Sequence, residues 1–407
     1  MAALQNCVER SPICFAVILS LLLVAPPRLS AQSNTRLLLS VGYGVPGHTG
    51  FSFGPFSDLA MNENREIAFL STLRSPRNEL RAVVVSSGVS FSVVAFQGLQ
   101  APVPKTSYDS FSAPSLNNAG VFCFAAGLKD TEGKPSSAII RVDGTGARAL
   151  VTSEDSLPGA PDAAFLEFSA PLINSQGNVL FAARWGGKSP ATGLFLWTPQ
   201  ELRRLELPAG VSPTPKDLFE PIFFSRDEAA LVLRGTPPEA ALEQFFRGVA
   251  VRSFQELKPA PDPADTFQIL APRAGQTPVQ MVLVIMESEN VQTALLPGDS
   301  SQPVMARRVE GAPEAKPLAQ IEGQTTSAQG NIIFAATPLD SPDDVGLYCY
   351  CEGQVTRLTS AEEFSAVVQT APGKPILSLV GDGQHTEAFI APGAAEAGSA
   401  IYVTSIP

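Results

Sequence analysis

Apolar runs recur along the chain at a nearly constant spacing, and a polar turn precedes each of them. Three segments align by eye: SFSAPSLNNAGVFCFAAG, EFSAPLINSQGNVLFAAR and QIEGQTTSAQGNIIFAAT. Their common frame extends to seven apolar anchors about 53 residues apart, namely Phe69, Phe124, Phe181, Val232, Leu283, Phe334 and Phe389. A fixed period of this length predicts one small structural unit that is repeated along the chain.

Two further columns at fixed offsets support this frame. Seven residues before each anchor lies a polar residue, usually of a type favoured in turns: Asn62, Asn117, Asn174, Ser225, Gln276, Ser327 and Asp382. Six residues earlier again lies a large apolar residue: Phe56, Phe111, Phe168, Phe219, Leu270, Ile321 and Ile376. The repeat is therefore visible in three independent columns.

Each repeat contains four short segments typical of strands. In the third repeat these are 166–173, 178–184, 193–197 and 202–207, with a turn at 174–177. The second segment is apolar without alternation, which indicates a strand covered on both faces. Sheets covered on both faces at this period are typical of radially stacked blades. We predict an all-β fold: a seven-bladed β-propeller of four-stranded blades.

The last repeat is incomplete, and the start of the chain carries the missing part. Residues 375–381, 386–392 and 399–405 supply three strands of blade 7, but the chain stops at Pro407. Residues 35–41 (TRLLLSV) are similar to fourth strands elsewhere in the chain. We therefore expect the N-terminal strand 35–41 to complete blade 7 beside residues 400–404, which would close the propeller.

The first 31 residues have the three zones of a secretory signal peptide. A short polar start containing Arg10 precedes an apolar stretch at 13–24, and small residues follow at 29–31. The apolar stretch is too short for a membrane span. We expect cleavage after Ala31, an exported propeller at residues 32–407, and a periplasmic or extracellular location. No membrane span is expected.

Charge and cysteine content narrow the function classes. The full chain has a net charge of −11, and the signal contributes one net positive charge, so the mature chain carries −12. An acidic chain without a basic cluster is an unsuitable partner for nucleic acid. Three cysteines remain after cleavage, Cys123, Cys349 and Cys351. This odd number argues against a disulfide framework, so we expect three free thiols, with a Cys349–Cys351 bond as the alternative.

Two stretches carry a family resemblance. SLNNAGVFCF followed by SSAIIRVDGTGARAL, and INSQGNVLFAAR followed by GLFLWTPQELRRLEL, resemble the repeat of TolB-like periplasmic propellers. They resemble more closely the secreted bacterial tandem-repeat propellers built from Asn-x-x-Gly units. The Pro-Asp of the TolB-type turn is absent from this chain. The resemblance covers nearly the whole mature chain and implies the fold, the export route and a binding role.

Catalytic chemistry has few candidates in this sequence. Propeller hydrolases and lactonases place carboxylates at the axial channel, often around a divalent ion. Asp58, Glu220 and Glu322 are the inner-strand acids available for such a site. The frame puts the two histidines, His48 and His385, at opposite ends of the blades, which excludes a shared metal or proton relay. A wet, mildly acidic channel is the simpler interpretation, and we expect no cofactor.

Binding is the leading hypothesis. Loops between second and third strands carry Lys129, Asp343 and, beside two glycines, Arg184 and Trp185. Tryptophan in a loop is a marker of binding surfaces, although Trp185 can equally cap its blade. We expect a monomeric, non-catalytic module that presents this face to a protein or glycan. The alternative is a hydrolase or lactonase at the channel mouth.

Overall fold

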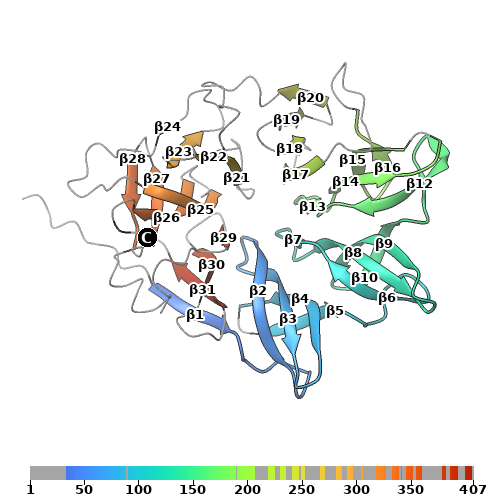
Figure 1. The fold of residues 1–407 in the computed structure, drawn as a ribbon, viewed down its shortest axis with the longest axis horizontal. Coiled ribbons are helices and arrows are strands. Elements are labelled where there is room, and N and C mark those ends of the chain that lie inside the picture. Colours follow the sequence, from blue (N-terminus) through green and yellow to red (C-terminus); the bar gives the residue numbers. More distant parts are fainter. Residues whose placement is uncertain are drawn as a thin grey trace, which may run out of the picture. The chain divides into compact units, whose positions relative to one another are not determined.

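All regular structure in the described part of the chain is β-strand. The computed structural model describes residues 34–206, apart from 89 and 189, and beyond them strands between 219 and 405 with residues 341, 345, 358 and 359. These strands form antiparallel sheets, numbered here first to seventh (Figure 1). The predicted all-β fold is confirmed. No helix among the described residues is long and apolar enough to cross a membrane.

The first three sheets are described almost completely. The first contains β2 (Ser52–Met61), β3 (Ile67–Arg74), β4 (Glu79–Ser86) and β5 (Phe91–Phe96). The second contains β6 (Thr106–Phe111), β7 (Ser115–Leu116), β8 (Phe122–Asp130), β9 (Pro135–Asp143) and β10 (Gly146–Thr152). The third contains β11 (Ser156–Leu157), β12 (Ala160–Phe168), β13 (Leu172–Ile173), β14 (Val179–Trp185), β15 (Ala191–Trp197) and β16 (Leu202–Arg204).

The other sheets are described mainly through their strands. The fourth contains β17 (Phe219–Phe224), β18 (Ala230–Arg234), β19 (Ala241–Phe246) and β20 (Val249–Arg252). The fifth contains β21 (Thr266–Leu270), β22 (Met281–Met286), β23 (Val291–Leu296) and β24 (Val304–Met305). The sixth contains β25 (Leu318–Thr326), β26 (Ile332–Pro338), β27 (Gly346–Cys351) and β28 (Gln354–Arg357). The seventh contains β29 (Ser378–Gly381), β30 (Thr386–Pro392), β31 (Ser399–Ser405) and β1 (Asn34–Ser40).

The anchor column of the sequence forms the centre of each sheet's core. Not counting the short strands β7, β11 and β13, we call β3, β8, β14, β26 and β30 the second strands of their sheets. Each of them carries one completely buried anchor: Phe69, Phe124, Phe181, Phe334 and Phe389. In the first three sheets the anchor ring meets the earlier phenylalanine column edge-on. The ring centroids are 5.7, 5.8 and 5.6 Å apart for Phe56–Phe69, Phe111–Phe124 and Phe168–Phe181. This repeated contact explains why both columns recur along the chain.

Neighbouring sheets share apolar clusters. One cluster joins the seventh sheet to the first, and others join the first to the second, the second to the third, the third to the fourth, and the sixth to the seventh. Strand β23 of the fifth sheet also contacts β25 of the sixth. In the first three sheets the two central strands, β3 and β4, β8 and β9, and β14 and β15, have runs of consecutive buried residues, so both of their faces are covered. Packing on both faces is why these strands are apolar without alternation.

The N-terminal strand β1 lies beside the C-terminal strand β31. Their antiparallel register pairs Asn34 with Ser405 and Ser40 with Ala400, with an irregularity between Leu37 and Leu39. The hydroxyl of Thr35 donates to that of Thr404 at 2.9 Å. Leu39 is 2% exposed and belongs to the cluster between the seventh and first sheets. The N-terminal strand was expected to pair beside residues 400–404, and β1 pairs with β31 there.

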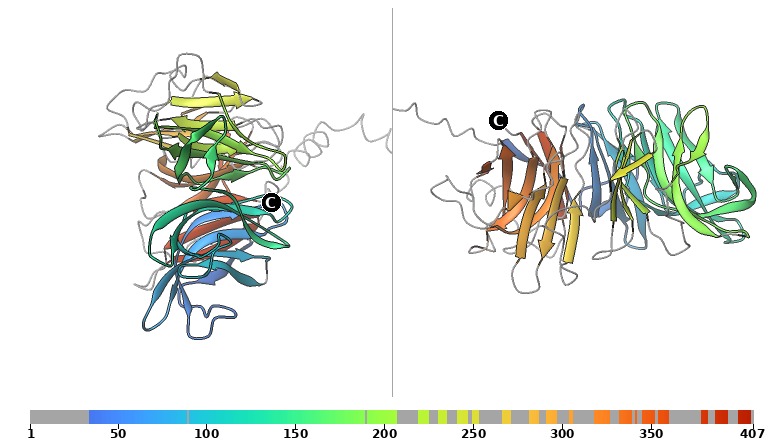
Figure 2. Two further views of the ribbon diagram at one scale, coloured as in Figure 1. Left: turned by 90° about the vertical axis from the view of Figure 1, so that its right-hand side faces the viewer. Right: turned by 90° about the horizontal axis from the view of Figure 1, so that it is seen from above.

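The sheets have two distinct ends, seen in side view in Figure 2. We call one the Asn end: it carries the turns that follow Asn62, Asn117 and Asn174. We call the other the link end: it carries the connections between sheets and those between second and third strands. Pairing of Ser52 with Arg74 and of Thr106 with Asp130 shows that β2 and β6, the first strands of the first and second sheets, start at the link end.

The turns at the Asn end require a left-handed residue at their fourth position. Gly120 and Gly177 have φ of 71° and 82°, and Arg65 occupies the same position in the first sheet with φ of 63°. A side chain at such a φ is strained. The Asn-x-x-Gly pattern is therefore a backbone requirement, which the first sheet meets with a strained arginine.

Replacing Gly177 with alanine should destabilise the protein by about 1–2 kcal/mol, because a Cβ disfavours its φ of 82°. Steric conflict contributes little, since the added Cβ would lie 3.8 Å from its nearest neighbour, Nη2 of Arg141. Gly144→Ala is the matched control, because that turn glycine has open space around it and no positive φ. Denaturant melts of both variants measure the difference, and equal midpoints would contradict the strain argument.

Candidate functional site

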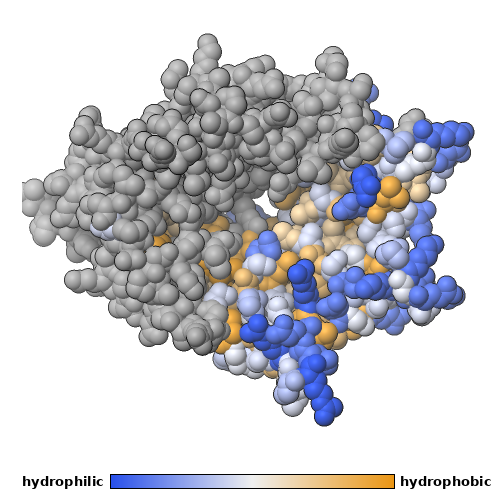
Figure 3. Space-filling model, in the orientation of Figure 1, coloured by the Kyte–Doolittle hydropathy of each residue, from blue (hydrophilic) through white to orange (hydrophobic). Residues whose placement is uncertain are grey.

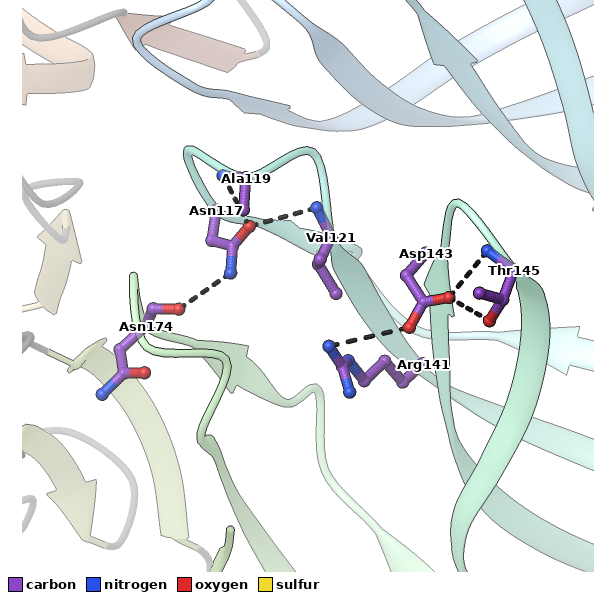
Figure 4. A network of polar contacts seen from close by, with 7 residues as sticks. All are labelled: Asn117, Ala119, Val121, Arg141, Asp143, Thr145 and Asn174. Carbon is purple, nitrogen blue, oxygen red and sulfur yellow. Dashed lines mark hydrogen bonds and ion pairs between the residues drawn. The ribbon is translucent and has the colours of Figure 1, made fainter. Parts of the chain in front are cut away.

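Each described asparagine turn is capped by its own side chain. Oδ1 of Asn117 accepts hydrogen bonds from the N–H groups of Ala119 and Val121, at 3.0 and 3.1 Å (Figure 4). Oδ1 of Asn62 and of Asn174 accept the equivalent pairs in the first and third sheets. A short amide side chain suits this cap because it reaches its own backbone two and four residues on.

The amide nitrogen of the same side chain holds the next sheet. Nδ2 of Asn62 donates to the carbonyl of Asn117 at 2.9 Å, and Nδ2 of Asn117 donates to the carbonyl of Asn174 at 3.0 Å. Both bonds are buried. The first two turns have further contacts, since Nδ2 of Asn64 donates to the Asn118 carbonyl at 2.8 Å. The asparagine column therefore acts as both a turn cap and a clamp between sheets.

Ser112 lies between β6 and β7, and Ser169 lies between β12 and β13, where regular strand pairing is interrupted. Each hydroxyl accepts a 2.9 Å bond from a second-strand N–H, that of Ala125 or Ala182. Each also donates to the carbonyl of the residue that follows it, at 3.2 Å. These serines therefore satisfy backbone groups where pairing lapses, and their hydroxyls are not free nucleophiles.

Asp58 occupies the equivalent irregular region of the first sheet. Its side chain is exposed and its φ is 54°, one of three positive values among the described non-glycine residues. The repeat frame places Ser57, not Asp58, in the column of Glu220 and Glu322. Glu220 lies in β17 and Glu322 in β25, but their side chains fall outside the described ones. Of these three candidate acids, only Asp58 therefore has a described side chain.

Metal-binding residues do not gather in the described part of the chain. No three His, Cys, Asp or Glu residues there lie close enough together to hold an ion. His48 packs edge-on against Phe96, with ring centroids 5.5 Å apart. His385 lies outside the described residues. The expected separation of the two histidines stays a prediction.

A charged pair missed by the sequence analysis lies at the Asn end of the second sheet. Asp143 accepts hydrogen bonds from the hydroxyl and N–H of Thr145, at 2.6 and 2.9 Å, and Arg141 lies 3.6 Å away (Figure 4). The Thr145 hydrogen bonds, and secondarily Arg141, hold the pKa of Asp143 below its ordinary value. The Asp-Gly-Thr turn of residues 143–145 was the sequence signal for this carboxylate.

The link end carries exposed pairs of opposite charge between first and second strands. Nζ of Lys129 lies 2.7 Å from Asp109 in the second sheet. In the third sheet Arg184 lies 3.2 Å from Glu167, and Lys188 lies 3.4 Å from Asp162. Two of the predicted binding residues, Lys129 and Arg184, are therefore exposed but already paired. The third charged residue, Asp343, lies outside the described residues.

The prediction that Trp185 is an exposed loop aromatic is wrong. It is the last residue of β14 and only 4% exposed. Its ring meets Phe195 edge-on at 5.8 Å, and the guanidinium of Arg204 lies 4.8 Å from its centroid. Gly193 makes room for it, because a Cβ there would lie 3.2 Å from the ring. Trp185 thus caps its sheet, the alternative that the sequence left open.

Hydrophilic side chains cover much of the described surface in Figure 3, with smaller apolar areas between them. Leu166, at the link end of the third sheet, is 49% exposed. It lies beside Gly186, and its carbonyl accepts a hydrogen bond from the hydroxyl of Ser137 in the second sheet. A half-exposed leucine among paired charges gives this end a mixed apolar and polar character.

The expectation of three free thiols is corrected at Cys349, which is disulfide-bonded. Cys123 is free and fully buried, and burial raises the pKa of its thiol. Cys349 lies in β27, two residues before Cys351 along the same strand. The odd cysteine count gave no warning of this bond, because one free thiol leaves an even number to pair.

Thiol labelling of the denatured mature chain without reductant should modify one cysteine, Cys123. After reduction it should modify three, because Cys351 is the one remaining partner for Cys349 in the expected mature chain. In the native state Cys123 should resist labelling, since its thiol is buried and its pKa is raised. Mass spectrometry counts the labels, and three before reduction would contradict the bond.

The comparisons with known proteins agree with the all-β architecture of the described strands. Residues 28–202, less than half of the chain, match the model of a family of unknown function, DUF7453. No curated protein matches. An oligogalacturonate lyase from Vibrio parahaemolyticus aligns with a TM-score of 0.51 at 10% identity, over 93% of this chain and 99% of that chain. The Dos1 propeller aligns at 0.45 and 9% identity, over 86% of this chain and 92% of that chain.

A puromycin-hydrolyzing peptidase from Mycobacterium tuberculosis aligns with a TM-score of 0.47 at 11% identity, over 88% of this chain and 53% of that chain. At such identities the likeness is one of fold. The neighbours are β-propeller proteins, and the all-β chain described here is similar to them in architecture.

Proposed function

We propose that the chain is an exported binding module built as a single seven-bladed propeller. The seven sheets are its blades, and β1 closes the ring by completing the seventh. The pairing of β1 with β31 and the shared apolar clusters support this arrangement. The resemblance to TolB-like and secreted tandem-repeat propellers supports the export route and the binding role. The mature protein begins near Gln32, acts as a monomer, and is periplasmic or extracellular.

The link end is the proposed binding face. The observation that supports it is that three largely exposed ion pairs of the second and third sheets and the half-exposed Leu166 lie at the end where the first strands of these sheets begin. Exposed pairs contribute little to folding stability, and such groups are instead suited to orienting a partner. The partner is a protein or a glycan recognised by polar groups with a small apolar contact.

A pull-down from the native envelope fraction tests this role. Glu167→Lys should weaken recovery of the partner, because it places like charges beside Arg184 at the link end. Glu201→Lys is the matched control: Glu201 is a similarly exposed acid near an arginine of the same sheet, but lies at the Asn end. Equal recovery with both variants would contradict binding at the link end.

A hydrolase or lactonase at the channel mouth is the second candidate. The positive φ of the exposed Asp58 favours it, because strained non-glycine residues concentrate at functional sites. Such an enzyme would use Glu220 and Glu322 with Asp58, with or without a divalent ion. Turnover of a panel of lactones and esters that is lost in Glu220→Gln and Glu322→Gln, but kept in Glu201→Gln, would establish it. No turnover by the wild-type protein would exclude that panel's chemistry.

A further inference from the structure

Among the described residues, Tyr43 has the most exposed large hydrophobic side chain. It is 57% exposed, against 54% for Leu37 and 49% for Leu166. Tyr43 lies in the link between β1 and β2, which enters the first sheet at its link end beside Arg74. The proposed binding face therefore has an exposed aromatic residue, but it is this tyrosine and not Trp185.

The backbone holds this tyrosine in place from both sides. Its N–H donates to the carbonyl of Ser40 at 3.2 Å, and its carbonyl accepts from the N–H of Phe53 at 2.8 Å. The preceding residue, Gly42, donates to the carbonyl of Phe53 at 2.7 Å. The ring is thus presented from a backbone that is already ordered, which lowers the entropic cost of binding.

Glycines flank the tyrosine and recur along the link. A Cβ added at Gly42, Gly44, Gly47 or Gly50 would meet nothing within 4 Å. Residues 41–50 contain no Asp, Glu, Lys or Arg. The nearby His48 ring is engaged with Phe96. The link therefore offers one aromatic ring between two glycines, in a segment without charged side chains.

We infer that Tyr43 is a stacking platform for one sugar ring of a neutral glycan, which deepens the proposed function and rests on it. The C–H face of a pyranose covers one aromatic ring, and the glycines on either side of Tyr43, Gly42 and Gly44, leave room for that contact. A protein interface needs a broader apolar core than a single ring among glycines supplies. A net charge of −12 on the mature chain disfavours acidic glycans.

Affinity electrophoresis of the mature protein in gels containing dextran, galactomannan or mixed-linkage β-glucan tests the inference, with polygalacturonate as the acidic comparison. The wild-type protein should be retarded by at least one neutral polysaccharide and not by polygalacturonate. Tyr43→Ala should weaken that binding about tenfold, as truncation of a central aromatic contact does. Tyr43→Phe should remain within about twofold, because it keeps the stacking face.

Leu37→Ala is the control, because it removes a similarly exposed apolar side chain from the neighbouring strand β1. It should bind like wild type, and all three variants should melt with the wild-type protein. Retardation that survives in Tyr43→Ala would overturn the role of Tyr43 while leaving glycan binding intact. No retardation by any neutral polysaccharide would overturn the inference itself, and the envelope pull-down would then decide the proposed function separately.

Discussion

A mature chain that lacks residues 34–40 should melt about 10 °C or more below the intact mature chain, or aggregate. The deletion removes the whole of β1, which pairs with β31 along its length and contributes the buried Leu39 to the cluster between the seventh and first sheets. It also exposes an edge of β31 that can pair with another chain. Differential scanning calorimetry and light scattering measure the two outcomes.

Two leucines on β1 separate the effect of burial from that of chain length. Leu39→Ala should cost about 2–4 kcal/mol, since Leu39 is 2% exposed and its removal leaves a cavity. Leu37→Ala should change stability by less than about 0.5 kcal/mol, because that side chain is 54% exposed. A deletion variant that melts like the intact chain would argue against the closure and against the count of seven blades.

Substitution of Asn117 should have the second largest effect. Asn117→Ala removes both the cap on its own turn and the clamp on the Asn174 carbonyl, which leaves one buried carbonyl and two partly buried N–H groups without this partner. We expect a loss of about 2–4 kcal/mol. Chemical denaturation followed by fluorescence measures it, and a loss below about 1 kcal/mol would contradict the role of this side chain.

Asn117→Asp keeps the acceptor of the turn cap but loses the donor of the clamp, so the pH dependence of its stability reports on the clamp alone. The carboxylate still accepts the bonds of the cap, but the second oxygen then faces the Asn174 carbonyl and has no proton to donate. Burial and this contact should raise the folded-state pKa of the new carboxyl above its unfolded value of about 3.9. The folded state then binds more protons between the two pKa values, so stability falls as pH rises through that window. The deficit relative to wild type should be smaller at pH 4 than at pH 7, and a constant deficit would contradict the clamp.

The sequence predicts the repeat well because the repeat is a matter of packing. Phe69, Phe124 and Phe181 were recognisable because each needs a large apolar neighbour at a fixed offset, and periodicity reports such needs directly. The asparagine turns were recognisable for a similar reason, although only the structure shows the bond from Nδ2 to the next sheet. The count of seven blades stays a prediction.

The candidate site was much harder to predict. Trp185 looked like a loop residue because glycines follow it, yet the space that buries it comes from Gly193 on a different strand. Tyr43 gave no periodic signal, since its exposure depends on hydrogen bonds to Ser40 and Phe53 across the link. The odd number of cysteines favoured free thiols and left the bond at Cys349 as the alternative. The burial of Trp185 and the exposure of Tyr43 depend on contacts between segments that no local pattern encodes.

The clamp between sheets has a direction. Asn62 donates to the second sheet and Asn117 to the third, so each sheet is gripped by the one that precedes it in the chain. The acceptor is a main-chain carbonyl, which any amino acid supplies. For this bond, only the sheet that carries the asparagine is restricted in sequence. A duplicated unit that keeps its asparagine therefore brings its own donor, and the unit after it needs only a main-chain carbonyl. A protein assembled in this way can gain units by duplication, and the residue that supplies the accepting carbonyl can then change, within the limits set by the apolar clusters between sheets.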